Sequence, residues 1–208
     1  MISTIRTKNL EFMDMIKYPD IDIKEQSITF IDGESGCGKS TLLKLFNGTQ
    51  SPSNGLIEYK GKNIDNMSLI ELRKDVILAS QDIFLFDGSI KDNFKEFYDF
   101  REEKCIEDKE MKKYLEISCA DFPLEAKCQT LSGGERQRVF LAIYLSFKSK
   151  VILLDEPIAS LDEKTSIRFF EQTIKYCKDN SITMISVCHN PKLVQMFGEN
   201  IITLRKEG

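Results

Sequence analysis

Hydrophobic residues along the chain gather in short runs, which alternate with longer stretches where they recur at helical spacing. Short apolar runs bounded by turn residues predict strands, and the longer stretches predict helices that connect one strand to the next. This alternation is typical of an α/β fold with a mainly parallel sheet. The expected strands are Ser27–Ile31, Leu56–Tyr59, Val76–Ser80, Val151–Leu154, Thr183–Val187 and Ile201–Leu204.

The pattern changes between about residues 92 and 127, where the chain becomes charged and helix-favouring and shows no strong strand. We therefore expect a helical subdomain there. It would be inserted into a core formed by residues 1–91 and 128–208, with the whole chain as a single domain. The charges of this segment are more typical of a solvated helix face than of a binding surface.

Composition and charge indicate the class of protein. The chain has 208 residues, enough for one sizeable α/β domain with a small insert. Apolar residues make up 41% and charged residues 30%, and no run approaches the roughly 20 apolar residues that cross a bilayer. The net charge of −4 gives no attraction for nucleic acid or anionic lipid. Since the N-terminus also lacks a secretory signal pattern, we expect a cytosolic protein that inserts into no membrane and binds no nucleic acid directly.

Six cysteines are scattered along the chain without a C-x-x-C pair, and only one histidine accompanies them. This spacing disfavours a zinc site. In a cytosolic protein, we expect such cysteines to be reduced and mostly buried.

The first chemical signal is the run GESGCGKST at residues 33–41, which fits the pattern G-x-x-x-x-G-K-S/T. It lies between an expected strand and an expected helix, which favours a phosphate-binding loop over a plain glycine-rich turn. Backbone N–H groups and the helix N-terminus would face the phosphates. Lys39 would reach the β and γ oxygens, and the Ser40 hydroxyl would bind Mg²⁺. The expected nucleotide contacts are Gly33, Glu34, Ser35, Gly36, Cys37, Gly38, Lys39, Ser40 and Thr41.

The second signal is the apolar run Val151–Leu154, which ends in the adjacent carboxylates Asp155 and Glu156. Ligands of open parallel sheets bind beyond the carboxyl ends of the strands, so both acids would lie beside the phosphate loop. Asp155 is suited to hold Mg²⁺, and Glu156 is placed to polarise the attacking water. An apolar strand that ends in Asp-Glu is common by itself, and the upstream phosphate loop gives this one its significance.

The third signal is the run LSGGERQR at residues 131–138, which precedes an expected helix. A Ser-Gly-Gly turn at a helix N-terminus can present N–H groups to an anion, although a plain serine N-cap is the simpler interpretation. The run resembles the LSGGQ signature of ABC (ATP-binding cassette) ATPases, and it follows the phosphate loop and precedes the acidic strand, as in that family. The resemblance covers about residues 5–204. It implies a phosphate-loop NTPase core with a mainly parallel sheet, an N-terminal antiparallel β region, an inserted helical subdomain, and ATP with Mg²⁺ as ligands.

The resemblance also assigns residues beyond the phosphate loop. Gln81 resembles the Q-loop glutamine that binds Mg²⁺ and senses the water, and Asp162 lies in a D-loop-like run, Ser160–Asp162. His189 resembles the switch histidine that contacts the γ-phosphate. The implied catalytic residues are then Lys39, Gln81, Glu156 and His189, and the implied metal ligands are Ser40, Gln81 and Asp155.

Membership of this family would imply a head-to-tail dimer of cassettes that forms on ATP binding. Ser132, Gly133 and Gly134 of one subunit would then contact an ATP held by the other subunit. The family also places an aromatic residue before the phosphate loop to stack on adenine. The equivalent position falls near Asp14, and Phe12 and Tyr18 are the alternatives.

The main hypothesis is an ATPase subunit that drives membrane permease subunits from the inner face of the cell membrane. The alternatives are a soluble ABC ATPase acting in a nucleic-acid or ribosome-associated process, and a regulatory cassette that binds ATP without hydrolysing it. The run Ile83–Phe94 resembles exporter-type cassettes, and the chain more weakly resembles those of metal export. We expect Phe84, Leu85 and Phe86 to form the permease docking surface, with core packing as the alternative. Because a permease selects the substrate, the sequence predicts neither cargo nor direction.

Overall fold

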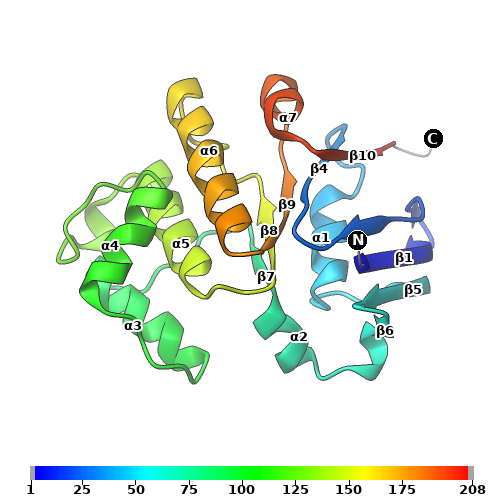
Figure 1. The fold of residues 1–208 in the computed structure, drawn as a ribbon, viewed down its shortest axis with the longest axis horizontal. Coiled ribbons are helices and arrows are strands. Elements are labelled where there is room, and N and C mark those ends of the chain that lie inside the picture. The colour runs from blue at the N-terminus through cyan, green and yellow to red at the C-terminus, as the bar shows by residue number, and fades with distance from the viewer. Residues whose placement is uncertain (1–2, 206–208) are drawn as a thin grey trace. The chain divides into compact units, whose positions relative to one another are not determined.

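The fold is described from a computed structural model, which describes residues 3–205 (Figure 1). The chain forms two compact units, each made from segments distant in sequence. The first unit consists of Met1–Ser80, Ser149–Glu156 and Cys177–Gly208, and the second of Gln81–Lys148 and Pro157–Tyr176. No helix within residues 3–205 is long and apolar enough to cross a bilayer.

A five-stranded parallel sheet forms the centre of the first unit, in the order β10-β4-β9-β8-β7. All residues of β8 and β9 are buried, as expected for parallel strands that are covered on both faces. The mainly parallel sheet predicted from the sequence is therefore confirmed. Its strands are β4 (Ile28–Gly33), β7 (Val76–Ala79), β8 (Val151–Asp155), β9 (Thr183–Val187) and β10 (Asn200–Leu204).

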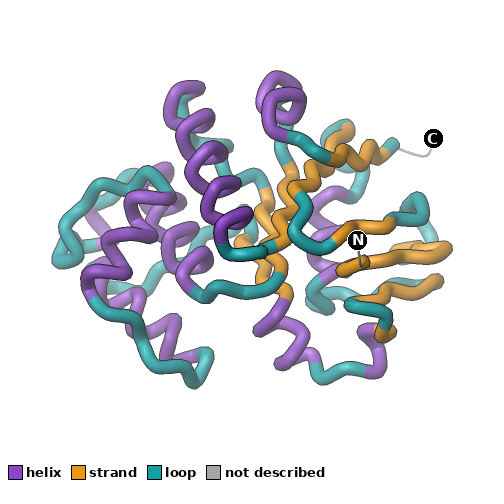
Figure 2. Tube along the Cα trace, in the orientation of Figure 1, coloured by secondary structure: helices purple, strands orange, loops and turns teal. Residues whose placement is uncertain are grey.

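A second, antiparallel sheet contains the N-terminal strands, and Figure 2 shows the strands of both sheets in orange. Its order is β2-β1-β5-β6, and β3 also pairs with β1. The predicted N-terminal antiparallel region is confirmed, and the expected strand Leu56–Tyr59 lies within it. The strands are β1 (Ser3–Phe12), β2 (Ile16–Lys17), β3 (Asp22–Lys24), β5 (Asn54–Tyr59) and β6 (Lys62–Asn63).

One hydrophobic core joins the two sheets of the first unit. Ile5 of β1, Ile31 of β4 and Leu43 of α1 all belong to it, and each is at most 1% exposed. Since α1 follows the phosphate loop directly, this packing fixes the base of the loop. The helices of the unit are α1 (Lys39–Phe46), the 3-10 helix η1 (Ile64–Asn66), α2 (Leu69–Asp75) and α7 (Pro191–Phe197).

The second unit is helical, and among its described residues only an isolated bridge between Ser89 and Lys127 has strand-type pairing. The helices α3, α4 and α5 pack against one another. This unit contains the predicted helical segment at 92–127 and extends beyond it, because it also includes α5 and most of α6. Its elements are α3 (Ile90–Phe100), α4 (Asp108–Ile117), η2 (Cys128–Thr130), α5 (Gly133–Ser146) and α6 (Glu163–Asp179).

The cysteines follow the expectation of mostly buried, reduced side chains. All six are free thiols, and none of the described residues forms a disulfide. Cys37, Cys128, Cys177 and Cys188 are buried, whereas Cys105 and Cys119 are half-buried.

Candidate functional site

The phosphate loop connects β4 to α1 in the first unit, and Gly38 is the N-cap of α1. Gly33 has a φ of +149° and lies against β10. A Cβ atom at Gly33 would lie 2.5 Å from the Leu204 carbonyl oxygen and 2.9 Å from the Cys37 sulfur. Only glycine therefore fits at this position, and the close approach sets where the loop leaves the sheet.

Lys39 folds back over the loop that precedes it. Its Nζ donates hydrogen bonds to the carbonyl oxygens of Gly33, at 2.8 Å, and Glu34, at 2.7 Å. The residue is 5% exposed. The cation is thereby held inside the curve of the loop, where a phosphate group would meet it.

Tyr18 packs against the phosphate loop. Its hydroxyl donates a hydrogen bond to the Gly38 carbonyl oxygen at 3.1 Å, and burial raises the pKa of Tyr18 to about 12. Its ring is buried, and Phe12 is half-buried against the core of the same unit. Burial disfavours Tyr18 as a stacking surface for adenine. The structure instead gives it a packing contact at the start of α1, which the sequence reasoning missed.

The hydroxyl of Ser40 donates a hydrogen bond to Asp155 Oδ1 at 3.0 Å, although the two residues are far apart in sequence. Asp155 ends β8 and is 3% exposed. Burial raises the pKa of its carboxyl group, and the Ser40 hydrogen bond partly opposes this rise. A hydroxyl and a carboxylate oxygen so close together form a donor set that fits Mg²⁺, which prefers oxygen ligands.

Glu156 follows Asp155 with a φ of +51°, a left-handed backbone conformation that is uncommon for a residue other than glycine. Its backbone N–H donates to the Val187 carbonyl oxygen of β9 at 3.3 Å. His189 Nε2 lies 2.8 Å from Glu156 Oε1. The first unit therefore brings together five predicted residues at the carboxyl ends of adjacent strands: Lys39, Ser40, Asp155, Glu156 and His189.

The predicted signature turn starts α5 in the second unit. Ser132 is the N-cap of the helix, and Glu135 completes a capping box by accepting the Ser132 backbone N–H at 2.7 Å. The spacing S-x-x-E is a readable signal for this box, which the sequence reasoning did not use. A Cβ atom at Gly133 would have no neighbour within 4 Å, whereas one at Gly134 would lie 2.9 Å from the Ser160 carbonyl oxygen. Gly134 therefore permits close contact between the signature turn and the predicted D-loop.

Asp162 and Gln81 also belong to the second unit. Asp162 accepts hydrogen bonds from the backbone N–H of Thr165, at 3.0 Å, and from its hydroxyl, at 2.6 Å, at the start of α6. These bonds lower the pKa of Asp162. Gln81 is exposed and is the first residue of the unit, directly after Ser80.

The expected docking cluster divides between surface and core. Phe84 is 58% exposed, and its ring meets that of Phe86 edge to face at a centroid distance of 4.7 Å. Phe86 stacks on Phe100, which is 73% exposed. Leu85 is only 6% exposed, so its assignment to the exposed surface is wrong. Neighbouring side chains of an extended segment point to opposite sides, so Leu85 packs inward on the side opposite the Phe84–Phe86 contact.

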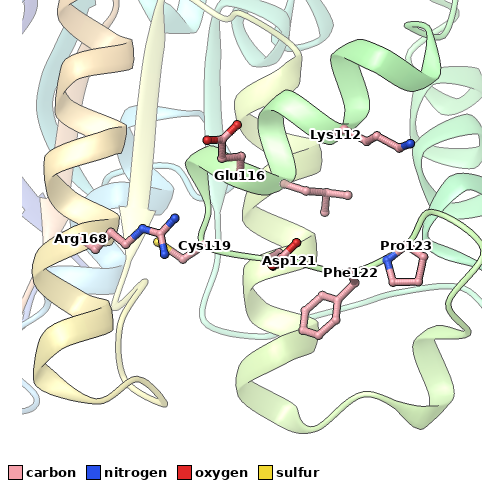
Figure 3. Close-up of a pocket in the computed structure, with 9 residues that line it drawn as sticks. Lys112, Glu116, Cys119, Asp121, Phe122, Pro123 and Arg168 are labelled. Carbon is pink, nitrogen blue, oxygen red and sulfur yellow. The ribbon is translucent and has the colours of Figure 1, made fainter.

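A hollow of about 510 Å³ also lies in the second unit, between α4, the loop after it and α6. Figure 3 shows Arg168 of α6 beside Cys119, with Glu116, Asp121 and Phe122 around the same space. Burial raises the pKa of the Cys119 thiol, and the nearby Arg168 and Arg138 partly oppose this rise. No predicted site residue lines this hollow, so it is separate from the chemistry described above.

Comparison with known proteins gives consistent results in sequence and structure. A protein-family profile described as ABC transporter matches residues 16–159. Phosphate import ATP-binding protein PstB of Campylobacter jejuni is 34% identical over 183 residues, which cover 82% of this chain and 73% of PstB.

Two solved structures have nearly the same fold. The cbiO1 protein from Clostridium perfringens, described as part of the ABC transporter complex cbiONQ, has a TM-score of 0.84 at 27% identity. The match covers 100% of this chain and 88% of cbiO1. A bacterial ABC transporter cassette, MJ0796, solved as a dimer, has a TM-score of 0.85 at 25% identity. The match covers 97% of this chain and 94% of the MJ0796 chain.

Proposed function

The chain belongs to the ABC transporter family as an ATP-binding and ATP-hydrolysing subunit, and from this premise we propose that two copies close on two ATP molecules to drive a membrane permease. The observation that carries the proposal is the division of the chemistry between the two units. The first unit holds Lys39 with the Ser40–Asp155 and Glu156–His189 pairs. The second unit presents an open signature turn at Gly133.

The phosphate loop would bind the triphosphate through its backbone N–H groups, and Lys39 would exchange its contacts with the loop carbonyls for β- and γ-phosphate oxygens. Ser40 and Asp155 would hold Mg²⁺, with Gln81 as a further ligand. The bound ion would supply neutralising charge beside the phosphate oxygens.

Glu156 would take the proton of the attacking water while the water oxygen attacks the γ-phosphorus and the bond to the β–γ bridging oxygen breaks. His189 would hold the Glu156 carboxylate in place through the 2.8 Å contact. A third residue that orients a base is a recurring feature of hydrolytic sites.

The signature turn would act on the ATP of the opposite subunit. Ser132 accepts the Glu135 backbone N–H at 3.4 Å, and its own hydroxyl proton can be donated to a phosphate oxygen. Gly133 and Gly134 would add backbone N–H groups at the positive end of α5. Asp162 would lie at the same interface, because the Ser160 carbonyl in its loop is close to Gly134.

The permease would dock on an aromatic surface formed by Phe84, Phe86 and Phe100. Two of these rings are more than half exposed, and together they form one stacked and edge-to-face group. Exposed aromatic groups of this kind mark interaction sites. Docking there would hold the chain at the inner face of the membrane.

The proposal is tested with the variant Glu156→Gln, which keeps nucleotide contacts but lacks the base. With ATP and Mg²⁺ we expect a stable dimer of twice the 23.9 kDa chain mass, measured by light scattering. Adding Ser132→Arg should prevent the dimer by blocking the signature turn while leaving ATP binding by each chain unchanged. A Glu156→Gln chain that binds ATP and stays monomeric, or a dimer unaffected by Ser132→Arg, would contradict the proposed arrangement.

A further inference from the structure

Asn93 is a polar side chain at the centre of an apolar helix face. It belongs to α3, and it is fully buried, as are Ile90 and Phe94 of the same helix. Asparagine is rarely placed at such a position, because an amide loses its water on burial and must find partners inside the protein. The partners of Asn93 therefore indicate what the residue does.

The first set of partners lies in the segment before α3, which contains the aromatic surface. Asn93 Oδ1 accepts the backbone N–H of Phe86 at 2.8 Å. Its Nδ2 donates to the carbonyl oxygens of Phe86, at 3.1 Å, and Ser89, at 3.0 Å. Both backbone groups of Phe86 are thus held by a single side chain, which fixes the Phe86 backbone relative to α3.

The second partner lies in the segment before the signature turn. Asn93 Nδ2 is 3.3 Å from the sulfur of Cys128, which is also fully buried. The two segments are joined by backbone bonds as well, since the Cys128 N–H donates to the Gly88 carbonyl oxygen at 2.9 Å and Ser89 pairs with Lys127. Asn93 therefore lies at the junction between the aromatic segment and the segment that leads to the signature.

Cys128 is connected in turn to the helix of the signature. Arg136, in the second turn of α5, donates from Nη1 to the Cys128 carbonyl oxygen at 2.9 Å. The N-cap of the same helix is Ser132. A displacement of Cys128 would therefore reach the start of α5 by two routes. One is the hydrogen bond to Arg136, and the other is the chain itself through residues 129–132.

We propose that Asn93 is a positioning residue that couples the permease docking surface to the signature turn. Movement of Phe86 under a docked permease helix shifts the Asn93 amide, and Asn93 transmits the shift through Cys128 and Arg136 to Ser132. Discrete hydrogen-bonded contacts of this kind give a coupling route a physical basis. The inference rests on the proposed function, because it assumes that Ser132 acts on ATP held by the opposite subunit.

The variant Asn93→Ala removes all four side-chain contacts. We expect ATP hydrolysis to fall about 10- to 100-fold, which a misplacement of about 1 Å at a catalytic group can produce. ATP binding by the isolated chain should stay unchanged, since the phosphate loop belongs to the other unit. The matched control is Tyr98→Phe in the same helix. It removes the buried hydrogen bonds of the Tyr98 hydroxyl to the carbonyl oxygen, at 2.9 Å, and hydroxyl oxygen, at 3.2 Å, of Ser146. Ser146 lies at the opposite end of α5 from the signature turn, so this change should leave hydrolysis unchanged.

Cys128 provides a milder second pair of variants if Asn93→Ala fails to fold. Cys128→Ala removes the acceptor of the Asn93 amide, and Cys128→Ser restores an acceptor at nearly the same place. We expect the alanine variant to lose hydrolysis and the serine variant to recover most of it. Equal activity in the two variants would overturn the proposed route.

A mixing experiment separates positioning of the signature from a general folding role. Asn93→Ala chains have an intact nucleotide site and a misplaced signature, whereas Glu156→Gln chains have an intact signature and no base. In a mixed dimer, the nucleotide site of the Asn93→Ala chain faces the intact signature. Equal amounts combined before ATP is added should therefore recover about a quarter of the wild-type rate, because half of the dimers are mixed and each has one competent site.

The outcomes identify which idea fails. If Glu156→Gln alone forms no dimer with ATP, the proposed function fails before Asn93 is tested. If that dimer forms, the Asn93→Ala chain binds ATP, and the mixture stays inactive, Asn93 does not act through the signature and the inference is wrong. Unchanged hydrolysis in Asn93→Ala would overturn it equally.

Discussion

His189 Nε2 and Glu156 Oε1 lie 2.8 Å apart at the carboxyl ends of the neighbouring strands β9 and β8. The two residues are 33 positions apart in sequence. They meet because the register of these parallel strands pairs Asp155 with Val187. The contact places the His189 ring where it can orient the Glu156 carboxylate. It therefore implies that the two residues act as one unit in hydrolysis.

We predict that His189→Ala and Glu156→Gln are strongly non-additive. Each single change should lower kcat about 100-fold or more, the usual contribution of a positioned base, with a smaller effect on KM. The double variant should be hardly slower than Glu156→Gln alone, because a histidine that orients the base has nothing left to orient. Steady-state kinetics of the four proteins measure this directly. Two effects that multiply in the double variant would show that His189 acts on its own.

A second prediction concerns the charge of the signature turn, where Glu135 takes the place of glutamine in the LSGGQ pattern. Its carboxylate accepts the Ser132 N–H at 2.7 Å, and this bond lowers the pKa of Glu135, so the side chain is charged near neutral pH. Glu135→Gln keeps the capping box and removes a negative charge beside the proposed γ-phosphate position. In the Glu156→Gln background we expect dimer formation at about two- to threefold lower ATP concentration, an effect that salt should reduce.

Glu135→Ala serves as the control for this charge effect. It removes the charge and the capping carboxylate together, so the start of α5 should become less stable and the dimer weaker. If Glu135→Gln needs as much ATP for dimer formation as the chain with Glu135, the charge is unimportant, and if Glu135→Gln and Glu135→Ala behave alike, the capping contact is unimportant.

Local patterns in the sequence predicted most of the fold, and the family resemblance added His189 to the predicted residues that the structure brings together. Each strand and motif is recognisable from residues that are close together in the sequence. The parallel sheet then brings the strand ends together, and Ser40 meets Asp155 in this way. Contacts between distant segments could not be predicted in the same way. The approach of Gly33 to Leu204 and the inward orientation of Leu85 depend on packing, which is not encoded in any short run of residues. Asn93 did leave a signal, a polar residue on an apolar helix face, but its partners come from the tertiary structure.

The division of the docking cluster leads to a third prediction, for the complete complex of the chain with its permease. Phe84→Ser should reduce permease binding and transport while leaving the isolated chain folded, because the Phe84 ring is 58% exposed. Leu85→Ser should instead destabilise the chain itself by about 2–4 kcal/mol, since it buries a polar group where a leucine packs. Thermal unfolding and ATP binding of the isolated variants distinguish the two. Equal losses of stability would place Phe84 in the core as well.

The last prediction follows from the buried carboxylate of Asp155. Burial raises its pKa, so the folded chain binds this proton more tightly than the unfolded chain does. The group's contribution to stability is then fully present below the unfolded pKa and is lost as the pH rises through the folded pKa. In EDTA without nucleotide, Asp155→Asn should therefore raise Tm at pH 7 and have little effect near pH 4. A rise of about 2–4 °C at pH 7 would correspond to roughly 1 kcal/mol in a chain of this size.

Asp162→Asn is the matched control, because hydrogen bonds from Thr165 lower the pKa of Asp162. Its contribution to stability is present above the unfolded pKa and is lost as the pH falls through the folded pKa. Its pH dependence is therefore opposite to that of Asp155. Asp162→Asn should thus lower Tm slightly at pH 7 and have no effect at low pH.

Adding Mg²⁺ and ATP should stabilise the wild-type chain by mass action and the Asp155→Asn chain much less. If Asp155→Asn is no more stable than the wild type at pH 7 in EDTA, the Asp155 carboxylate carries no desolvation cost in the free chain.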